Sequence, residues 1–343
     1  MKSLVLQSAG LNPIFEIEDR DYPHLPDNGV IVKVRAIGLC YHDISIIDGT
    51  LSRGVKNNLV LGHEVSGSVV DVGNDSLGLE IGQKVVVTLT SSCGTCEKCC
   101  SGADYRCDKA FGFGHGIDGG MSEFIAVDSK NVIPVPAEHD LISASLYGCP
   151  MGVAVNSLSM VPQITEQDKV VVFGVGGGLG IHAAQIAVSK GAEVISFTSS
   201  EHKYVQLEKL PIGQLFLIDD GLDVAELVFA MTEDHGADII FNPVGSAMFE
   251  QGVQSLANKG HMLITGEIKG KNLSVNAAEL IFRDAVIMGA SGANAHNIRQ
   301  VIKLVSDHKI RPVVGAEFGI SEILEAITKI KSKEILGRSV IVF

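Results

Sequence analysis

The sequence predicts an α/β protein in which a barrel-like all-β half is followed by a doubly wound parallel sheet. Three observations support this prediction. Short strand patterns dominate the chain up to about Pro136, strand and helix patterns alternate from Ala137 onward, and a glycine-rich turn joins one of the later strands to a helix. At 343 residues the chain is long for one hydrophobic core, so we expect two domains.

The N-terminal half contains short runs of β-branched and other apolar residues, separated by Gly, Asn and Asp. Such runs are typical of the strands of a small barrel. The expected strands cover residues 2–6, 30–36, 66–72, 84–89 and 121–127.

The second half alternates strand and helix patterns, as expected of a parallel sheet with crossover helices. Each strand is a short apolar run that is followed by a helical pattern. The expected strands begin near Val170 and Val194 and continue at 215–218, 238–241, 262–265 and 286–289.

The C-terminal residues are expected to return to the first half of the protein. A helical pattern at 298–305 leads to strand-like runs at 310–314 and 338–342. The predicted domain bounds are 1–150, 151–290 and, for the returning segment, 291–343.

The glycine-rich turn follows a β-branched run at 169–173 and opens a helix. It has the pattern G-x-x-G-G-x-G, which directs backbone amides and the positive end of a helix at one place, as a pyrophosphate requires. An alternative is a turn that only lets helix and strand pack closely. The strand before it and the helix after it favour dinucleotide binding. The residues expected to bind are Gly174, Gly177, Gly178, Leu179 and Gly180.

The residues beyond the next strand favour NADP(H) over NAD(H). An NAD site places an acidic residue roughly twenty positions beyond the glycines, where its carboxylate would repel a 2′-phosphate. That region holds the hydroxyl side chains Thr198, Ser199 and Ser200 instead. Lys203 follows at the start of the next helix, where its ammonium is expected to reach a phosphate. The carboxylate of Glu201 would oppose NADP(H) binding if it turned inward, because it would repel the phosphate. An alternative role for a Ser or Thr at this position is to cap the N-terminus of the next helix.

The composition argues against several classes of partner. The chain carries 27 basic and 40 acidic side chains for a net charge of −13, and no basic cluster is long enough to follow a row of phosphates. Nucleic acids and anionic membranes are therefore not expected to bind. No apolar run approaches the roughly twenty residues of a membrane span, and the start of the chain is too short for a signal core. We expect a cytoplasmic protein.

Five of the seven cysteines lie within fifteen residues, which suits a metal better than disulfides. Cys93, Cys96, Cys99 and Cys107 have the spacing C-x2-C-x2-C-x7-C and can close a tetrahedral zinc shell. A closed shell leaves no position for substrate, so this zinc would be structural. The alternative is an iron–sulfur cluster, but a proline typically follows the last cysteine in ferredoxins, and Asp108 follows here.

A second set of metal-binding residue types is scattered along the chain as Cys40, His63 and Cys149. Two sulfurs and one imidazole are the ligands of a catalytic zinc site whose fourth position is open to water or substrate. Taken singly, a cysteine is often a core residue and a histidine often a satisfied core side chain. Taken together, the three residues favour a second zinc.

The order of these motifs carries a resemblance to a known family. The chain contains the run Gly62-His63-Glu64-Val65-Ser66-Gly67 with Gly73, together with Cys40, the four-cysteine lobe and the glycine turn. In this combination it resembles the zinc-containing medium-chain dehydrogenase/reductases of the alcohol dehydrogenase type. The resemblance runs from Lys2 to Gly337-Arg338. It implies a GroES-like barrel as the catalytic domain and a Rossmann domain that binds the nucleotide.

The resemblance also implies roles for individual residues. Glu64 would be an occasional fourth zinc ligand, and Asp43 would be the carboxylate that orients His63. Arg338 is among the residues expected to bind the cofactor. The catalytic zinc would be held by Cys40, His63 and Cys149, and the structural zinc by the four cysteines of the lobe.

The substrate region departs from the resembled family. The second residue after the first zinc cysteine is commonly Ser or Thr there, and its hydroxyl relays the alcohol proton, whereas this chain has His42 after Tyr41. An imidazole can also relay a proton near neutral pH. Gly38-Leu39-Cys40-Tyr41 followed by Asp43 looks like the archaeal acryloyl-CoA reductases, which reduce a double bond conjugated to a thioester.

The sequence therefore favours a zinc-dependent oxidoreductase that moves a hydride between a nicotinamide and an alcohol/aldehyde or ketone. The alternative is an NADPH-dependent enoyl-thioester reductase. A non-catalytic protein that keeps the nicotinamide fold and a nucleic-acid-binding zinc ribbon are further alternatives, disfavoured by the intact ligands and the negative charge. We also expect a homodimer or homotetramer, because in the resembled family the last strand of the nucleotide sheet pairs across a two-fold axis.

Overall fold

The computed structural model describes residues 1–219, 221–268 and 270–343, and these divide into two compact units. We call them unit 1, which comprises Met1–Gly152, Gly292–Ile302 and Val314–Phe343, and unit 2, which comprises Val153–Ser291 and Lys303–Val313.

The domain bounds inferred from the sequence stay a prediction, and the contacts in the structure group one segment differently. Residues 303–313 belong to unit 2, although the sequence pattern placed them with the first domain. The Gln185 side chain donates a hydrogen bond to the Arg311 carbonyl at 3.1 Å and accepts one from the Arg311 N–H at 2.9 Å. A side-chain amide that pairs with a backbone in this way holds the segment against a helix of unit 2.

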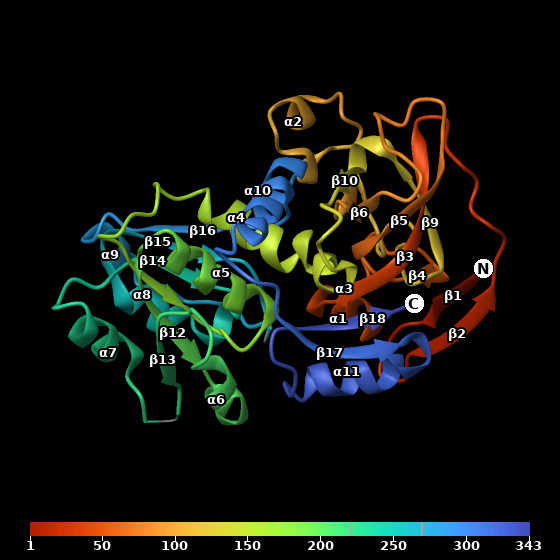
Figure 1. Ribbon diagram of the computed structural model, residues 1–343. Coiled ribbons are helices and arrows are strands. Elements are labelled where there is room, and N and C mark those ends of the chain that lie inside the picture. The colour runs from red at the N-terminus through yellow and green to blue at the C-terminus, as the bar shows by residue number, and fades with distance from the viewer. Residues whose placement is uncertain (220, 269) are drawn as a thin grey trace. The chain divides into compact units, whose positions relative to one another are not determined.

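Unit 1 is organised around β3 (Gly29–Leu39), a strand in which only Lys33 and Arg35 are exposed. The other strands of its main sheet are β5 (Glu64–Val72), β6 (Lys84–Val87), β9 (Phe124–Asp128), β10 (Val132–Pro134), β17 (Val314–Gly319) and β18 (Arg338–Val342). Within the described residues this sheet has seven strands in the order β10-β6-β5-β3-β18-β17, and β9 also pairs with β3 (Figure 1). Because β18 pairs antiparallel with β3, the C-terminal strand completes the barrel-like half that the sequence predicts.

Two smaller sheets belong to the same unit. β1 (Lys2–Ser8) pairs antiparallel with β2 (Ile14–Asp19) and with β4 (Leu59–Val60). The short strands β7 (Thr90–Ser91) and β8 (Phe111–Gly112) pair with each other on either side of the cysteine lobe, so they join the two ends of that lobe.

The helices of unit 1 place two of the candidate metal ligands. Helix α1 (Tyr41–Ile47) starts directly after β3, with Cys40 as its N-cap residue.

Among the described residues, one helical stretch, Leu141–Leu158, could span a membrane by length and composition, but 83% of it is buried, as in a core helix. The other helices with residues in this unit are α2 (Glu97–Cys100), η1 (Asp104–Arg106), η2 (Ser129–Asn131), α3 (Leu141–Ala144), η3 (Ser145–Tyr147), α4 (Pro150–Leu158), α10 (Ala295–Ser306), η6 (Ile320–Glu322) and α11 (Ile323–Lys331).

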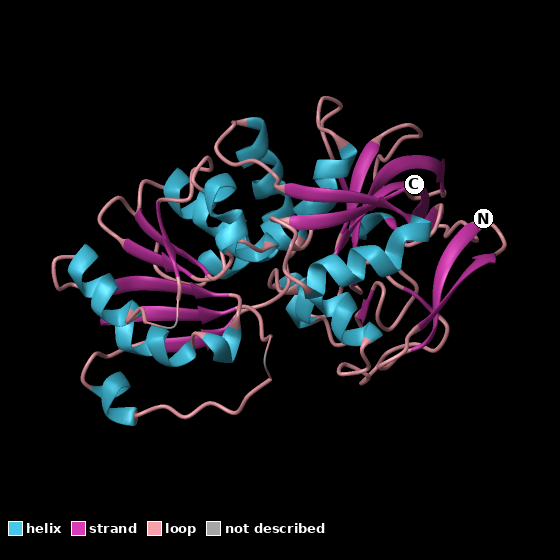
Figure 2. Cartoon of the chain, turned by 90° about the horizontal axis from the view of Figure 1, so that it is seen from below, coloured by secondary structure: helices cyan, strands magenta, loops and turns pink. Residues whose placement is uncertain are grey.

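Unit 2 is a parallel sheet with helices beside it (Figure 2). Its strands are β11 (Lys169–Val172), β12 (Glu193–Thr198), β13 (Gln214–Leu217), β14 (Ala237–Asn242), β15 (Leu256–Ile264) and β16 (Val286–Gly289). In the part of the chain that the structure describes, the six strands lie in the order β13-β12-β11-β14-β15-β16. Counted from β11 as first, this is 3-2-1-4-5-6, the order of a Rossmann sheet, whose ligands bind beyond the carboxyl ends of the strands where the order reverses.

The helices of unit 2 follow its strands, as the alternating sequence pattern predicts. The core includes apolar side chains from β11, β12, β14 and β15 together with two of these helices. The helices are α5 (Gly178–Ser189), η4 (Glu201–Lys203), α6 (Tyr204–Leu207), α7 (Val224–Met231), η5 (Gly245–Ala247), α8 (Phe249–Ser255) and α9 (Ala277–Ile281).

Candidate active site and metal centres

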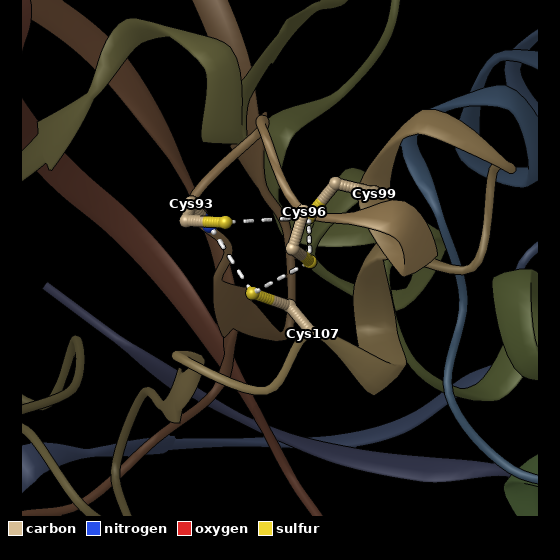
Figure 3. A group of neighbouring side chains, drawn as sticks. All are labelled: Cys93, Cys96, Cys99 and Cys107. Atoms are coloured by element: carbon tan, nitrogen blue, oxygen red, sulfur yellow. Dashed lines mark hydrogen bonds between the residues drawn. The ribbon is translucent and has the colours of Figure 1, made fainter.

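The four-cysteine lobe of unit 1 gathers its thiols at one point, as the sequence predicts. Figure 3 shows the four side chains turned toward one another. The Sγ atoms of Cys96 and Cys99 are 3.5 Å apart, those of Cys96 and Cys107 are 3.8 Å apart, and those of Cys93 and Cys99 are 3.9 Å apart. All four ligand atoms lie within 4.8 Å of one another.

These distances fit a zinc ion and do not fit disulfides. Thiolates about 2.3 Å from a zinc ion lie about 3.8 Å from one another at the corners of a tetrahedron. A disulfide would bring two sulfurs to about 2.05 Å. Hydrogen bonds from the backbone and side chain of Thr95 lower the pKa of Cys93 to about 5, which favours the thiolate that a metal binds. Cys100 is exposed and lies outside the cluster.

A second cluster in unit 1 consists of Cys40, His63, Glu64 and Cys149, whose ligand atoms also lie within 4.8 Å of one another. Its members come from separate elements: the end of β3, the residues around the start of β5, and the residue before α4. The structure therefore brings together the three scattered ligands that the sequence suggested, with Glu64 as a fourth donor. Two thiols, one imidazole and one carboxylate are a donor set that zinc accepts.

Asp43 contacts two members of this cluster from a fully buried position. Its Oδ2 accepts a hydrogen bond from the Cys40 N–H at 2.8 Å, and its Oδ1 lies 3.3 Å from His63 Nδ1. Burial by itself would lower the pKa of His63, but the charge and hydrogen bonding of Asp43, together with those of Cys40, outweigh burial and raise this pKa well above its usual value. With Nδ1 turned toward the carboxylate, Nε2 is the ring nitrogen left for a metal, which is the geometry that an orienting carboxylate requires.

Glu64 is also fully buried, and it pairs with Arg338. Its Oε1 lies 3.0 Å from Arg338 Nη2, and the same nitrogen is 4.0 Å from Cys149 Sγ. Burial raises the pKa of Glu64 to about 7, although the Arg338 charge acts in the opposite direction. Within the described residues, neither Glu64 oxygen forms a hydrogen bond of good geometry. Arg338 balances the charge of Glu64 at Oε1, whereas Oε2 has no hydrogen-bond partner among the described residues, so a buried acceptor remains beside two thiols and an imidazole, and this donor set fits a metal ion.

Arg338 lies beside the second cluster, and its predicted role in cofactor binding stays a prediction. It is buried and is the first residue of β18. The sequence carried no signal for its contact with Glu64, because the two residues are far apart in the chain and become neighbours only when β18 pairs with β3 and β3 with β5.

His42 lies next to the second cluster, as its position after Cys40 suggests. Its ring centroid is 5.3 Å from that of His63 in an edge-on arrangement. Burial lowers the pKa of His42. Its Nε2 lies 3.2 Å from Nδ1 of His115, a residue that the sequence pattern did not single out. His115 belongs to no recognisable motif, and only the folded chain places it beside His42.

The glycine turn lies at the carboxyl end of β11, where the strand order of unit 2 reverses. Gly174 has a φ of +62°, which other residues rarely adopt, and a side chain at Gly180 would lie 2.5 Å from the Gly174 carbonyl oxygen. Gly177 is the N-cap of α5. These glycines leave the first amides of α5 uncovered at the place where a Rossmann sheet binds a pyrophosphate.

The residues that we assigned to the adenosine end lie beside this turn. Thr198 ends β12 and is buried, and its Oγ1 accepts a hydrogen bond from the Ser200 N–H at 3.2 Å. Lys203 is buried, and its Nζ donates to the carbonyl oxygen of Gly176 at 3.4 Å. Ser200 precedes η4 without a side-chain capping bond, and Glu201 is exposed. A hydroxyl and an ammonium therefore adjoin the glycine turn.

Two family models match this chain. Residues 26–137 match the alcohol dehydrogenase GroES-like domain, and residues 178–307 match the zinc-binding dehydrogenase family. The first match covers most of the barrel sheet, without β17 and β18, and both cysteine-containing clusters except Cys149, and the second covers most of the Rossmann sheet.

Full-length relatives agree with these matches. The chain is 28% identical over 339 residues to an acryloyl-coenzyme A reductase of Metallosphaera sedula, with 98% of each chain covered. It is 29% identical over 342 residues to a sorbitol dehydrogenase of Halalkalibacterium halodurans, again with 98% of each covered. A crystal structure of an NAD-dependent alcohol dehydrogenase superposes with a TM-score of 0.94 at 25% identity, over 100% of both chains. With its two metal-binding clusters and Rossmann sheet, the chain belongs to the zinc-containing medium-chain alcohol dehydrogenase superfamily.

Proposed function

We propose that this zinc-dependent oxidoreductase moves a hydride between a nicotinamide and the carbonyl carbon of an alcohol/aldehyde or ketone pair. The observation that carries the proposal is the buried cluster of Cys40, His63, Glu64 and Cys149. A zinc ion held there supplies Lewis-acid chemistry, polarising a substrate oxygen. The nicotinamide supplies or accepts the hydride.

The residues of the chain would divide the remaining work. Cys40, His63 and Cys149 hold the metal, and Glu64 is the occasional fourth ligand. Asp43 fixes the His63 ring through its carboxylate, 3.3 Å from Nδ1. His42, whose ring lies 5.3 Å from that of His63, exchanges a proton with the substrate hydroxyl in the place of the usual Ser or Thr.

An enoyl-thioester reductase is the second candidate, and two observations favour it. The segment around Cys40 resembles the archaeal acryloyl-CoA reductases, and a protein of that name is 28% identical over 98% of this chain. The same cofactor would then deliver its hydride to the β-carbon of a conjugated thioester.

A substrate panel distinguishes the two reactions. Zinc-loaded protein is incubated with simple alcohols, aldehydes and ketones and, separately, with acryloyl-CoA, each with both nicotinamides, and turnover is followed by nicotinamide absorbance. Turnover of the alcohols and carbonyl compounds alone supports the first proposal. Turnover of acryloyl-CoA alone replaces it with the second, and no turnover of either class contradicts both.

For the cofactor we propose NADP(H) in preference to NAD(H). Support comes from the hydroxyl of Thr198 and the ammonium of Lys203 beside the glycine turn, and from the exposure of Glu201, whose carboxylate can face solvent. The double variant Ser199→Asp with Lys203→Ala adds the acid of an NAD site and removes the cation, so it should lose preference for NADPH. A higher kcat/KM with NADH in the wild type, or an unchanged preference in the variant, would contradict the assignment.

We also propose a cytoplasmic homodimer or homotetramer. The edge strand β16 carries the half-exposed Val286, and Phe282 just before it is 85% exposed. An apolar strand edge of this kind favours pairing with a second copy. Among the described residues all seven cysteines are free, as a reducing compartment would keep them.

A further inference from the structure

His42 is one end of a short hydrogen-bonded chain in unit 1 that no family motif contains. His42 Nε2 lies 3.2 Å from His115 Nδ1, and His115 Nε2 lies 3.0 Å from the carbonyl oxygen of Arg53. The two rings are 5.2 Å apart between centroids and tilted by 39°. The second nitrogen of His42, Nδ1, forms no hydrogen bond with any described residue.

The Arg53 carbonyl decides which nitrogens carry protons. A carbonyl oxygen can only accept, so His115 Nε2 must carry the hydrogen that it donates. In a neutral imidazole the other nitrogen is then an acceptor, so His115 Nδ1 accepts and His42 Nε2 donates. When both rings are neutral, His42 Nδ1 is therefore left as a bare acceptor.

His115 is held in place by backbone contacts that do not involve its ring. The His115 carbonyl oxygen accepts a hydrogen bond from the Lys56 N–H at 2.8 Å. The neighbouring Gly114 has a φ of +63°, and a side chain there would lie 2.5 Å from the Gly62 nitrogen. Because Gly62 immediately precedes the metal-binding His63, the segment that carries His115 is packed directly against the metal site.

We propose that His115 is a positioning residue that fixes the tautomer and ring plane of His42, with Nε2–H bound and Nδ1 available as the acceptor for a substrate hydroxyl. The proposal rests on the role proposed above for His42. It adds His115 to that role. His42 can remove a hydroxyl proton only if the nitrogen that faces the hydroxyl is an unprotonated acceptor, and His115 would keep His42 in that tautomer.

Two substitutions of His115 distinguish a role in positioning the His42 ring from a role in packing alone. In His115→Asn, the side-chain oxygen occupies the place of Nδ1 and can still accept from His42, whereas in His115→Gln the amide reaches the place of Nε2 and the acceptor near His42 is lost. His115→Gln should lower kcat about tenfold, as the loss of one hydrogen bond would, with the KM for the nicotinamide unchanged. His115→Asn should stay within about threefold of the wild type.

A readout independent of turnover is the tautomer of His42 itself. It is measured by NMR of the zinc-loaded protein with nitrogen-15-labelled histidine, and the His42 signals are identified by their loss in His42→Gln. The wild type and His115→Asn should show the Nε2–H tautomer, and His115→Gln should show a mixture of both. His24→Leu is the matched control, because His24 is an exposed histidine of unit 1, and it should leave both kcat and the His42 signals unchanged.

The outcomes distinguish this proposal from the proposed function. An unchanged His42 tautomer in His115→Gln, or equal losses of kcat in the Asn and Gln variants at full zinc content, would overturn the positioning role. If His42→Ala keeps full turnover, the catalytic role of His42 is wrong, and the NMR measurement still decides whether His115 sets its tautomer.

Discussion

The single carboxylate of Asp43 contacts two members of the second metal cluster, Cys40 and His63. One carboxylate oxygen accepts the Cys40 N–H, and the other faces His63 Nδ1 at 3.3 Å. Burial makes such a carboxylate costly unless charges and donors surround it, and here they are the imidazole, the backbone amide and the metal that the cluster fits. We therefore expect Asp43 to influence metal binding through the two ligands that it contacts, Cys40 and His63.

Asp43→Asn tests this expectation. The amide oxygen can still accept the Cys40 N–H, but the negative charge that faces His63 is gone. We expect zinc affinity at the second cluster to fall by about 10–100-fold, with the fold intact. Competition with a chelator measures the affinity, and Asp21→Asn, at an exposed position of the same unit, is the control. Equal affinity in wild type and Asp43→Asn would show that Asp43 does not support His63.

His42→Ala tests the residue that replaces the usual Ser or Thr. We expect turnover to fall by about 100-fold or more, the usual contribution of a positioned proton-transfer group, and the KM for the nicotinamide to change little. Steady-state kinetics over a range of pH, with substrate and cofactor varied separately, measure both quantities. Wild-type turnover at every pH would rule out the proton-exchange role.

At the level of elements, we expect the stability of the cysteine lobe to depend on a bound metal ion more than on packing. Its helix α2 has no buried residue, and the strands β7 and β8 that join its ends have two residues each. So short a segment has little apolar surface to bury, and a closed zinc shell would stabilise it directly.

Cys96→Ser should therefore remove one zinc ion and destabilise unit 1. We expect the midpoint of thermal unfolding to fall on the order of 10 °C. Cys100→Ser is the matched control, since Cys100 is the exposed neighbour outside the cluster, and it should leave both zinc content and midpoint unchanged. Metal analysis with differential scanning calorimetry makes the comparison, and equal midpoints in the two variants would contradict a structural zinc.

The elements also show which features can be predicted from the sequence. The parallel strands were predicted at their observed positions, except that β15 begins at Leu256 and not at residue 262. The inner strands β11, β12 and β14 were recognisable because strands buried on both faces are continuous apolar runs. The strand β2 was missed, since it is an edge strand whose Ile14 and Ile17 are exposed, and β10 was missed because it has three residues. The two metal clusters follow from residue chemistry, whereas the pairing of Arg338 with Glu64 and of His115 with His42 depends on strand pairing and loop packing that leave no local pattern.

At the level of the whole molecule, the prediction is a self-associated protein. The apolar residues Ile281 and Phe282, which are 69% and 85% exposed, lead into the edge strand β16. Light scattering should give the mass of a dimer or tetramer, and Phe282→Glu should shift the population toward the monomer by adding a charge to an apolar contact. Leu11→Glu, at a fully exposed apolar residue of unit 1, is the control and should not change the mass. A monomeric wild type at working concentration would contradict the prediction.

The zinc content of the fully loaded chain tests the central claim most directly, because the seven predicted ligands divide into one closed and one open shell without sharing any residue. Two zinc ions per wild-type chain are expected. Cys40→Ser should retain one zinc, in the four-cysteine lobe, and should lose hydride transfer. One zinc per wild-type chain, with an unchanged metal content in Cys40→Ser, would contradict the catalytic metal site and the function proposed from it.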